Sequence, residues 1–169
     1  PTPVLFVPGN HEYDLLDFDA THARLRETCT RLGIIWLERE VVTLDLLFAG
    51  KTAAKRPIRF AGTTLWSDFD ALSLQPSEGN DSMTSLLRSR EKAYRAANYY
   101  LRKAGTTRRG EMMLAELVRE QSLDCQQWLR KTLREPFDGT TVVITHFAPS
   151  LQSADPRYGL TPGTAGFCN

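Results

Sequence analysis

Short unbroken apolar runs alternate along the chain with longer segments whose apolar residues recur at helical spacing. Residues 4–7 (Val-Leu-Phe-Val) and 140–145 (Thr-Thr-Val-Val-Ile-Thr) are compact runs of strand-favouring residues, which is typical of strands buried on both faces of a sheet. Residues 41–48 and 58–65 predict two further strands. The basic stretch 50–57 between them predicts a hairpin turn.

Three segments are expected to be helical. The first begins near Asp19, a favourable N-cap residue, and ends at Gly33, which suits the left-handed position that follows a helix. A short strand at residues 34–37 comes next. Residues 83–103 and 110–133 predict two more helices, the second of them amphipathic, and the last part of the chain is expected to be loop. Strands that alternate with helices around one hairpin predict a mixed α/β fold.

The composition is that of a globular domain. The chain has 169 residues, 41% of them hydrophobic and 24% charged, with a formal net charge of +1, so no global field points to nucleic acid or to a membrane surface. No apolar run approaches the roughly 18 residues that a membrane-spanning helix needs. Cys29, Cys125 and Cys168 form no CxxC pair, which argues against a disulfide framework or a zinc ribbon. They favour a reducing compartment, so a cytoplasmic location is expected.

The two ends of the sequence indicate an incomplete domain. Pro1-Thr2-Pro3 stands in place of an initiator Met and leads almost directly into the first strand, and no closing element precedes residues 166–169. We therefore expect residues 1–169 to be a single, incomplete domain of a longer protein. Loss of the strands expected beside residues 4–7 would expose an apolar sheet edge, so the isolated chain is expected to associate or expand.

A potential metal ligand follows each of two apolar strands. Asn10 and His11 come directly after residues 4–7 and a Pro-Gly break, and His146 comes directly after residues 140–145. If the two strands are parallel neighbours in one sheet, these side chains converge at the edge where ligands bind in α/β proteins. Amide oxygen and imidazole nitrogen suit Mn, Fe, Zn or Ni better than Ca. The pattern therefore predicts a site for a transition-metal ion.

Three blocks of the sequence resemble those of calcineurin-like metallophosphoesterases. Residues 9–12 (Gly-Asn-His-Glu) resemble the central signature block of that family, and residues 145–150 (Thr-His-Phe-Ala-Pro-Ser) are similar to its later His block. Residues 60–69 (Phe-Ala-Gly-Thr-Thr-Leu-Trp-Ser-Asp-Phe) resemble a strand of the second sheet in a bacterial branch of the family. The blocks occur in the family's order, so the chain resembles the central segment of such an enzyme.

The resemblance implies a partial sandwich of mixed β-sheets flanked by helices and the hydrolysis of phosphate mono- or diesters by a metal-activated hydroxide. Two divalent ions (Mn, Fe, Zn or Ni) would serve the parent enzyme. Asn10 and His146 would ligate the second of these ions, and His11 would act as general acid or electrostatic stabiliser. Gly9 would let the loop turn sharply, and Glu12 would fix the orientation of a neighbouring group.

The sequence departs from the family pattern at both ends. It lacks the Asp-x-His and Gly-Asp-x-x-Asp blocks expected upstream and the Gly-His-x-His block expected downstream, and residues 19–22 (Asp-Ala-Thr-His) have the wrong spacing to replace them. The missing blocks would supply the ligands of the first metal ion and the bridging carboxylate. The chain is therefore expected to hold ligands for one ion at most, and to be inactive by itself.

Simpler interpretations stay open at each position. Asn10 and His11 fit a polar turn after a strand, with Asn10 in a left-handed conformation, and His146 fits a buried histidine bonded to the backbone. His22 lies on the face of a predicted helix. Asp68 is a loop carboxylate that could reach the rim of the site.

A function of another class also stays open. The basic residues from Arg88 to Arg109 interleave with Tyr94, Tyr99 and Tyr100, as in surfaces that bind phosphates and stack bases. Solvated helix faces carry similar charge without a partner. The alternatives to a phosphoesterase acting on an unidentified phosphoester are thus a non-catalytic protein that binds a polyanion such as a nucleic acid, and an inactive remnant of the same fold.

Overall fold

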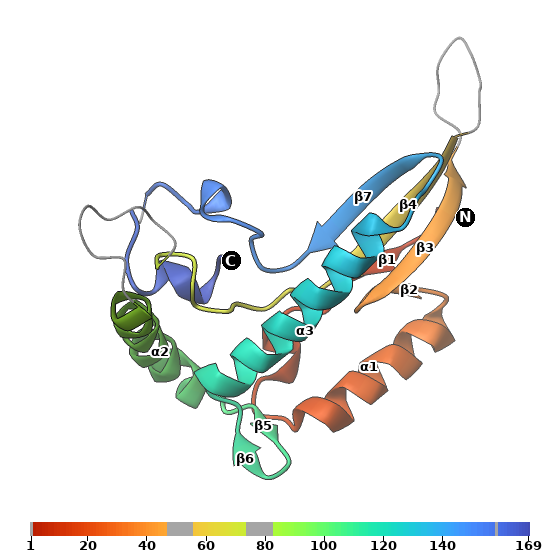
Figure 1. Ribbon diagram of the computed structural model, residues 1–169. Coiled ribbons are helices and arrows are strands. Elements are labelled where there is room, and N and C mark those ends of the chain that lie inside the picture. Colours follow the sequence, from red (N-terminus) through yellow and green to blue (C-terminus); the bar gives the residue numbers. More distant parts are fainter. Residues whose placement is uncertain (1, 47–55, 74–82, 158) are drawn as a thin grey trace.

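The computed structural model describes residues 2–46, 56–73, 83–157 and 159–169, which fold as a mixed α/β structure (Figure 1). The strands are β1 (Leu5–Phe6), β2 (Ile35–Trp36), β3 (Glu40–Leu46), β4 (Arg56–Thr63), β5 (Thr107–Arg108), β6 (Glu111–Met112) and β7 (Thr140–Thr145). The α-helices are α1 (Phe18–Leu32), α2 (Met83–Ala104) and α3 (Ala115–Arg134), and the short 3₁₀ turns are η1 (His11–Tyr13), η2 (Leu151–Ser153) and η3 (Thr164–Gly166). The predicted mixed α/β class is confirmed.

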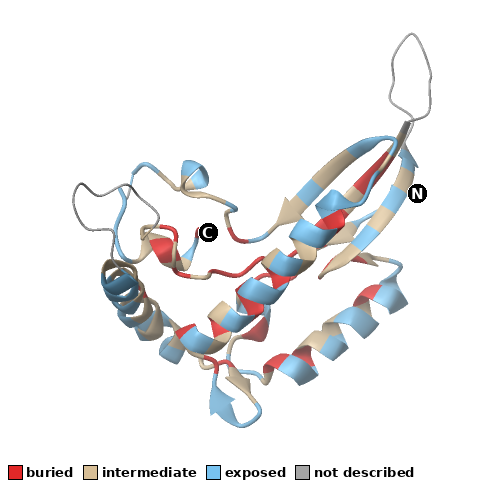
Figure 2. Ribbon diagram, viewed as in Figure 1, coloured by how far each residue is buried: buried red, intermediate tan, exposed pale blue. Residues whose placement is uncertain are grey.

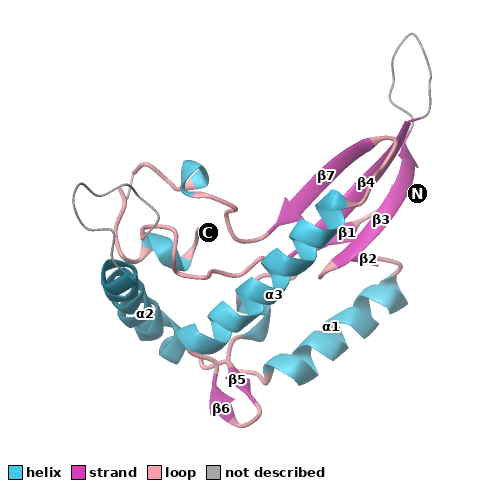
Figure 3. Cartoon of the chain, viewed as in Figure 1, coloured by secondary structure: helices cyan, strands magenta, loops and turns pink. Residues whose placement is uncertain are grey.

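Three strands form the largest sheet, in the order β3-β4-β7. β3 and β4 pair antiparallel with Glu40 opposite Gly62, so the predicted hairpin is confirmed, although most of its turn lies outside the described residues. β4 and β7 pair parallel with Thr63 opposite Thr145. β7 therefore ends beside the end of β4, and the loops that leave the two strands start at the same edge of the sheet (Figure 3).

The strands expected at residues 4–7 and 140–145 are not neighbours in one sheet, so the condition under which Asn10 and His146 were expected to converge is not met. β1 pairs in parallel with β2, with Leu5 opposite Ile35, and the described residues place this pair in a sheet separate from β7. Neither β1 nor β7 is buried on both faces, since Leu5 and Phe6 are only partly buried and Val143 is 41% exposed. The apolar runs gave the positions of the strands correctly, but a run of this length does not specify which strands become neighbours.

Helix α1 begins two residues earlier than expected. Asp17, and not Asp19, is its N-cap residue, and its carboxylate accepts the backbone N–H of Ala20 at 2.9 Å. Gly33 ends the helix at a φ of 67°, as predicted. The predicted second helix is confirmed as α2, which packs against α3 and η3.

Helix α3 begins at Ala115 and not near residue 110. The intervening residues form the small antiparallel hairpin of β5 and β6, in which Arg109 and Gly110 adopt left-handed φ values of 54° and 84°. Two successive left-handed residues form the turn that suits the twist of a two-residue hairpin. The amphipathic pattern of the helix is confirmed, because Val118, Ser122 and Cys125 form part of its buried stripe.

The segment that follows β4 forms the centre of the core (Figure 2). Leu65, Trp66 and Phe69 are buried and have positive φ values of 68°, 51° and 65°. Bulky residues rarely adopt such values because Cβ clashes with the backbone, so the surrounding structure holds this segment against its local preference. Trp66 packs on Tyr13 and on Phe147, with ring centroids 6.0 and 5.6 Å apart.

All three cysteines are buried free thiols. The described residues of the final segment form no regular element beyond η2 and η3, in agreement with the predicted loop, and the segment returns to the core through a bridge between Ala148 and Cys168. Within the described ranges, the helices lack the combination of length and apolar character that crossing a membrane requires.

Candidate functional site

The loops that follow β1 and β7 meet at the side chains of Asn10 and His146. The Asn10 Oδ1 atom lies 2.9 Å from Nε2 of His146. The two residues therefore come together, as the sequence predicted, although their strands belong to different sheets. Asn10 adopts a right-handed conformation, with φ of −74° and ψ of −32°, and its side chain caps no backbone group. This excludes the interpretation of Asn10 as a left-handed turn residue.

Gly9 allows the His146 ring to lie directly against the backbone of the first loop. A Cβ atom at Gly9 would stand 2.7 Å from Cε1 and 2.9 Å from Nε2 of His146. The sequence predicted that Gly9 adopts a backbone conformation that a side chain would forbid. The structure does not show this, because Gly9 is not among the residues with positive φ. Close approach of a neighbouring side chain, and not an unusual turn, is what requires glycine at this position.

Glu12 closes the first loop on itself. Its Oε2 atom accepts the backbone N–H of Gly9 at 2.7 Å. This contact fixes the start of η1 relative to Gly9. Glu12 thus holds a backbone segment of the candidate site.

The surroundings of His146 lower its pKa and so favour the neutral form of the imidazole ring. Partial desolvation lowers its pKa from the ordinary value of 6.5, and the nearby His11 lowers it further, whereas Glu12 opposes the shift. The ring also packs edge-on against Phe147, with centroids 5.3 Å apart. A lowered pKa leaves the ring uncharged at neutral pH, which is the form that binds a metal ion.

His11 faces solvent and is oriented by a carboxylate that the sequence did not single out. Its side chain is 79% exposed, and its Nδ1 atom lies 2.7 Å from Oδ2 of Asp14. With Nδ1–H donated to Asp14, the free Nε2 atom is presented to solvent. The sequence signal that could have identified Asp14 is its position three residues after His11, because side chains three residues apart lie on the same side of a 3₁₀ turn.

Two buried polar residues behind the loops were also missed. Thr64 is 1% exposed and contacts both loops, and the Glu38 carboxylate accepts the backbone N–H of Thr64. Neither stands in a sequence pattern that indicates burial. Such residues become apparent only when the tertiary structure places polar atoms of distant segments against them.

The donor set around Asn10 and His146 consists of two neutral groups. Of the nearby carboxylates, Glu12 accepts the Gly9 backbone N–H through Oε2 and Asp14 pairs with His11 through Oδ2, whereas the buried Oδ1 atom of Asp14 has no hydrogen-bond partner. Across the described ranges, three or more His, Cys, Asp or Glu side chains do not gather into a group that could hold a metal ion.

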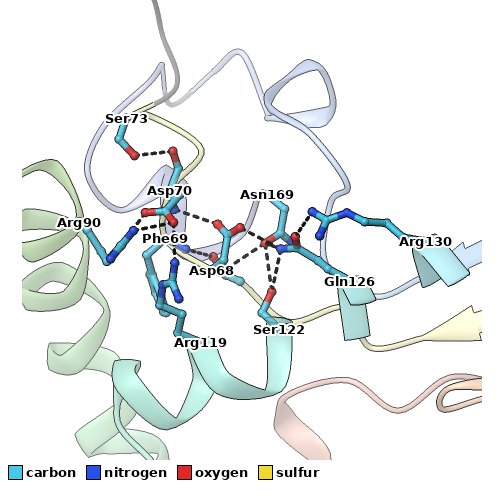
Figure 4. Close-up of polar contacts among 11 residues, drawn as sticks. Asp68, Phe69, Asp70, Ser73, Arg90, Arg119, Ser122, Gln126, Arg130 and Asn169 are labelled. Atoms are coloured by element: carbon cyan, nitrogen blue, oxygen red, sulfur yellow. Dashed lines mark hydrogen bonds and ion pairs between the residues drawn. The ribbon is translucent and has the colours of Figure 1, made fainter. Parts of the chain in front are cut away.

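The other candidates from the sequence have structural partners. His22 Nδ1 lies 3.1 Å from the Tyr13 hydroxyl, and burial lowers the pKa of this histidine. Asp68 accepts a hydrogen bond from Gln126 Nε2 at 2.8 Å and belongs to a polar network around Asn169 (Figure 4). Neither side chain contacts Asn10 or His146.

The basic segment contains both partly buried and exposed cations. Arg90 donates two hydrogen bonds to Asp70, at 2.7 and 2.8 Å, and Arg119 donates a third, so these arginines hold the core network together (Figure 4). Arg108 is paired with Asp19 at 3.1 Å. The cations that remain exposed on α2 are Arg88, Lys92, Arg95, Arg102 and Lys103.

Comparison with known proteins assigns no family to the chain. No protein-family model matches it, and no curated protein or solved structure gives a match.

Proposed function

We propose that the chain is part of a metal-dependent phosphoesterase of the calcineurin-like type, and that its described sheets are part of the corresponding two-sheet sandwich. The observation that carries the proposal is the 2.9 Å approach of Asn10 Oδ1 to His146 Nε2. These residues stand 136 positions apart, at the two places where a metal ligand was predicted. Their meeting supports the proposal because a polar turn and an isolated histidine would have no reason to converge.

The two side chains fit one divalent ion. Asn10 Oδ1 and His146 Nε2, which lie 2.9 Å apart, would hold the ion. Their donor atoms suit Mn, Fe, Zn or Ni. Because both are neutral, the carboxylates that offset the charge of a metal centre would have to come from residues other than these two.

His11 is the proposed proton donor to the leaving group. When bound, a divalent ion in such a site supplies a hydroxide at neutral pH and neutralises charge on the phosphoryl group. As proton donor, the exposed His11 ring would carry a proton on both nitrogens, with Nδ1–H held by Asp14 and Nε2–H facing the solvent from which a substrate enters. A positioned imidazole of this kind accelerates loss of an alkoxide by roughly 10²–10⁴-fold. Gly9 and Glu12 keep the loop in the shape that places Asn10 beside His146.

The test is Mn²⁺-dependent hydrolysis of an aryl phosphodiester by the protein in its native length. We expect His146→Ala to abolish both the activity and the bound metal. His22→Ala is the matched control, because it removes a histidine whose ring contacts Tyr13 and not the site. Unchanged activity and unchanged metal content in His146→Ala would refute the proposal.

A second function is favoured by one observation, the exposed basic face of α2. Five cations are exposed on this helix, and Glu91 is the exposed acid among them, paired with Arg95 at 3.7 Å. If the chain binds a polyanion through this face, its binding should be salt-sensitive and should need no metal ion. Replacement of Arg88, Lys92 and Arg95 by Gln should abolish such binding, whereas a phosphoesterase keeps its metal affinity in the same variant.

A further inference from the structure

We propose that Thr64 is a positioning residue that holds the Asn10 loop and the His146 loop at a fixed separation, and that Glu38 holds Thr64 in place. This inference rests on the proposed function, because it explains how two loops from different sheets come to share one metal ion. Neither residue contacts Asn10 or His146, so both act through the backbone of the loops.

Thr64 contacts the two loops through different atoms. Its backbone carbonyl accepts the N–H of Phe147, the residue after His146, at 3.1 Å. Its hydroxyl lies 2.9 Å from the carbonyl oxygen of Pro8, which precedes Gly9. One buried residue at the end of β4 therefore joins a residue directly beside each half of the candidate site. No strand pairing joins β1 to β7 in the described part of the chain, so this contact does what a shared sheet would otherwise do.

Glu38 fixes the position of Thr64 from the opposite side. Its Oε2 atom accepts the backbone N–H of Thr64 and lies 2.7 Å from the Thr64 hydroxyl, whose single proton it shares with the Pro8 carbonyl oxygen at 2.9 Å. Its Oε1 atom lies 3.2 Å from the Thr63 hydroxyl and 3.5 Å from Cys125 Sγ. The Glu38 side chain is 4% exposed, and a buried carboxylate is maintained only where donors satisfy its oxygens.

The backbone that follows Thr64 supports a functional constraint. Leu65 and Trp66 are both left-handed, with φ values of 68° and 51°. Strain of this kind persists where the surrounding contacts over-determine the conformation, and it concentrates at functional sites. The N–H of Leu65 donates to the Thr63 hydroxyl at 3.3 Å, so hydrogen bonds fix the chain on both sides of Thr64.

The test compares variants that differ in one hydroxyl. Thr64→Val keeps the shape of the side chain but removes the hydroxyl contacts to Pro8 and to Glu38, and Thr64→Ser keeps both. Thr63→Val is the matched control, because Thr63 is equally buried and also contacts Glu38, but makes no hydrogen bond to either loop. Asn10→Ala provides the reference state in which His146 has lost its partner.

The first measurement is the ¹⁵N chemical shift of His146 Nε2 in metal-free protein of native length, with the signal identified by its loss in His146→Gln. We expect Thr64→Val to move this shift toward its value in Asn10→Ala, while Thr64→Ser and Thr63→Val stay at the wild-type position. If Thr64→Val stays at the wild-type position, or Thr63→Val moves as far, the inference is refuted. If circular dichroism shows that Thr64→Val does not fold, the Glu38→Gln variant is measured instead. Its amide offers one acceptor oxygen in place of two, so it should move the His146 Nε2 shift in the same direction. An unchanged shift in Glu38→Gln refutes the inference.

The second measurement is the affinity for Mn²⁺. We expect Thr64→Val to weaken it by roughly 10–100-fold, the usual cost of losing a residue that orients a ligand, and Thr64→Ser to restore it. Equal affinity in Thr64→Val and wild type contradicts the inference. Failure of the wild-type protein to bind Mn²⁺ refutes the proposed function instead, and the histidine shift then still decides whether Thr64 positions the loops.

Discussion

Gly9→Ala separates the geometry of the candidate site from the stability of the fold. The added Cβ atom would stand 2.7 Å from Cε1 of His146 and 2.9 Å from both His146 Nε2 and Glu12 Oε2. The 2.7 Å contact falls about 0.8 Å short of a normal approach between carbon atoms. The clashing atoms are side-chain ends, so we expect the His146 ring to swing away from the loop and its Nε2 atom to leave Asn10.

Two magnitudes follow from this displacement. Overpacking costs roughly 1–3 kcal/mol, but the clash is relieved by rotating a solvent-exposed ring, so the loss in the free energy of unfolding should lie near the lower end, about 1 kcal/mol. The affinity for Mn²⁺ depends on both donors and should fall by at least roughly 10-fold. Urea unfolding and calorimetric titration with Mn²⁺ measure the two effects separately.

Gly166→Ala is the matched control for this substitution. A Cβ atom at Gly166 would meet Phe69 and Ala97 at 3.9 and 4.0 Å, which are ordinary contacts. We expect its Mn²⁺ affinity to equal that of the wild type. Unchanged Mn²⁺ affinity in Gly9→Ala would refute the reasoning, because an added atom at this position cannot leave the His146 ring where it lies.

Three further outcomes are expected. His11→Asn should lower the hydrolysis rate by roughly 10²–10⁴-fold without changing Mn²⁺ affinity, and an equal loss of metal affinity would contradict its role as proton donor. The free energy of unfolding should fall as the pH drops below about 6.5, because burial lowers the pKa of His22 in the folded state and the unfolded chain takes up the proton first. Urea unfolding of His22→Gln should show a smaller fall, and a pH dependence identical to that of the wild type would contradict this assignment. Asp70→Ala leaves Arg90 and Arg119 without their carboxylate and should lower the free energy of unfolding by about 3 kcal/mol or more. Glu91→Ala breaks an exposed pair and should lower it by about 0.5 kcal/mol or less. Equal losses in urea unfolding would contradict a stabilising role for the Asp70 network drawn in Figure 4.

Local chemistry made several elements predictable. The left-handed preference of Gly33 ended α1, and the apolar runs around the basic turn gave the hairpin of β3 and β4. The meeting of Asn10 and His146 was also predicted, because each follows a strand at the end where ligands gather. The physical basis of that prediction was incomplete, since β1 and β7 are not neighbours and Thr64 brings their loops together instead.

The remaining features depend on contacts between distant segments. Leu65 and Trp66 adopt a conformation that their own side chains disfavour, so no local propensity indicates it. The burial of Glu38 depends on donors from Thr63 and Thr64 that become its neighbours only in the folded chain. Arg109 has no preference for the left-handed conformation that it adopts in the turn before α3. Gly110 alone does not indicate whether a hairpin or a helix begins at this position.

The most direct test of the central claim is paramagnetic broadening by substoichiometric Mn²⁺, observed on the histidine ring and asparagine side-chain signals of the protein in its native length. If Asn10 and His146 share one metal ion, the His146 ring and the Asn10 amide lose intensity together at the lowest Mn²⁺ concentrations, while the His22 ring, paired with Tyr13, keeps its intensity. Equal broadening of His22 and His146, or no broadening of His146 at all, contradicts the claim.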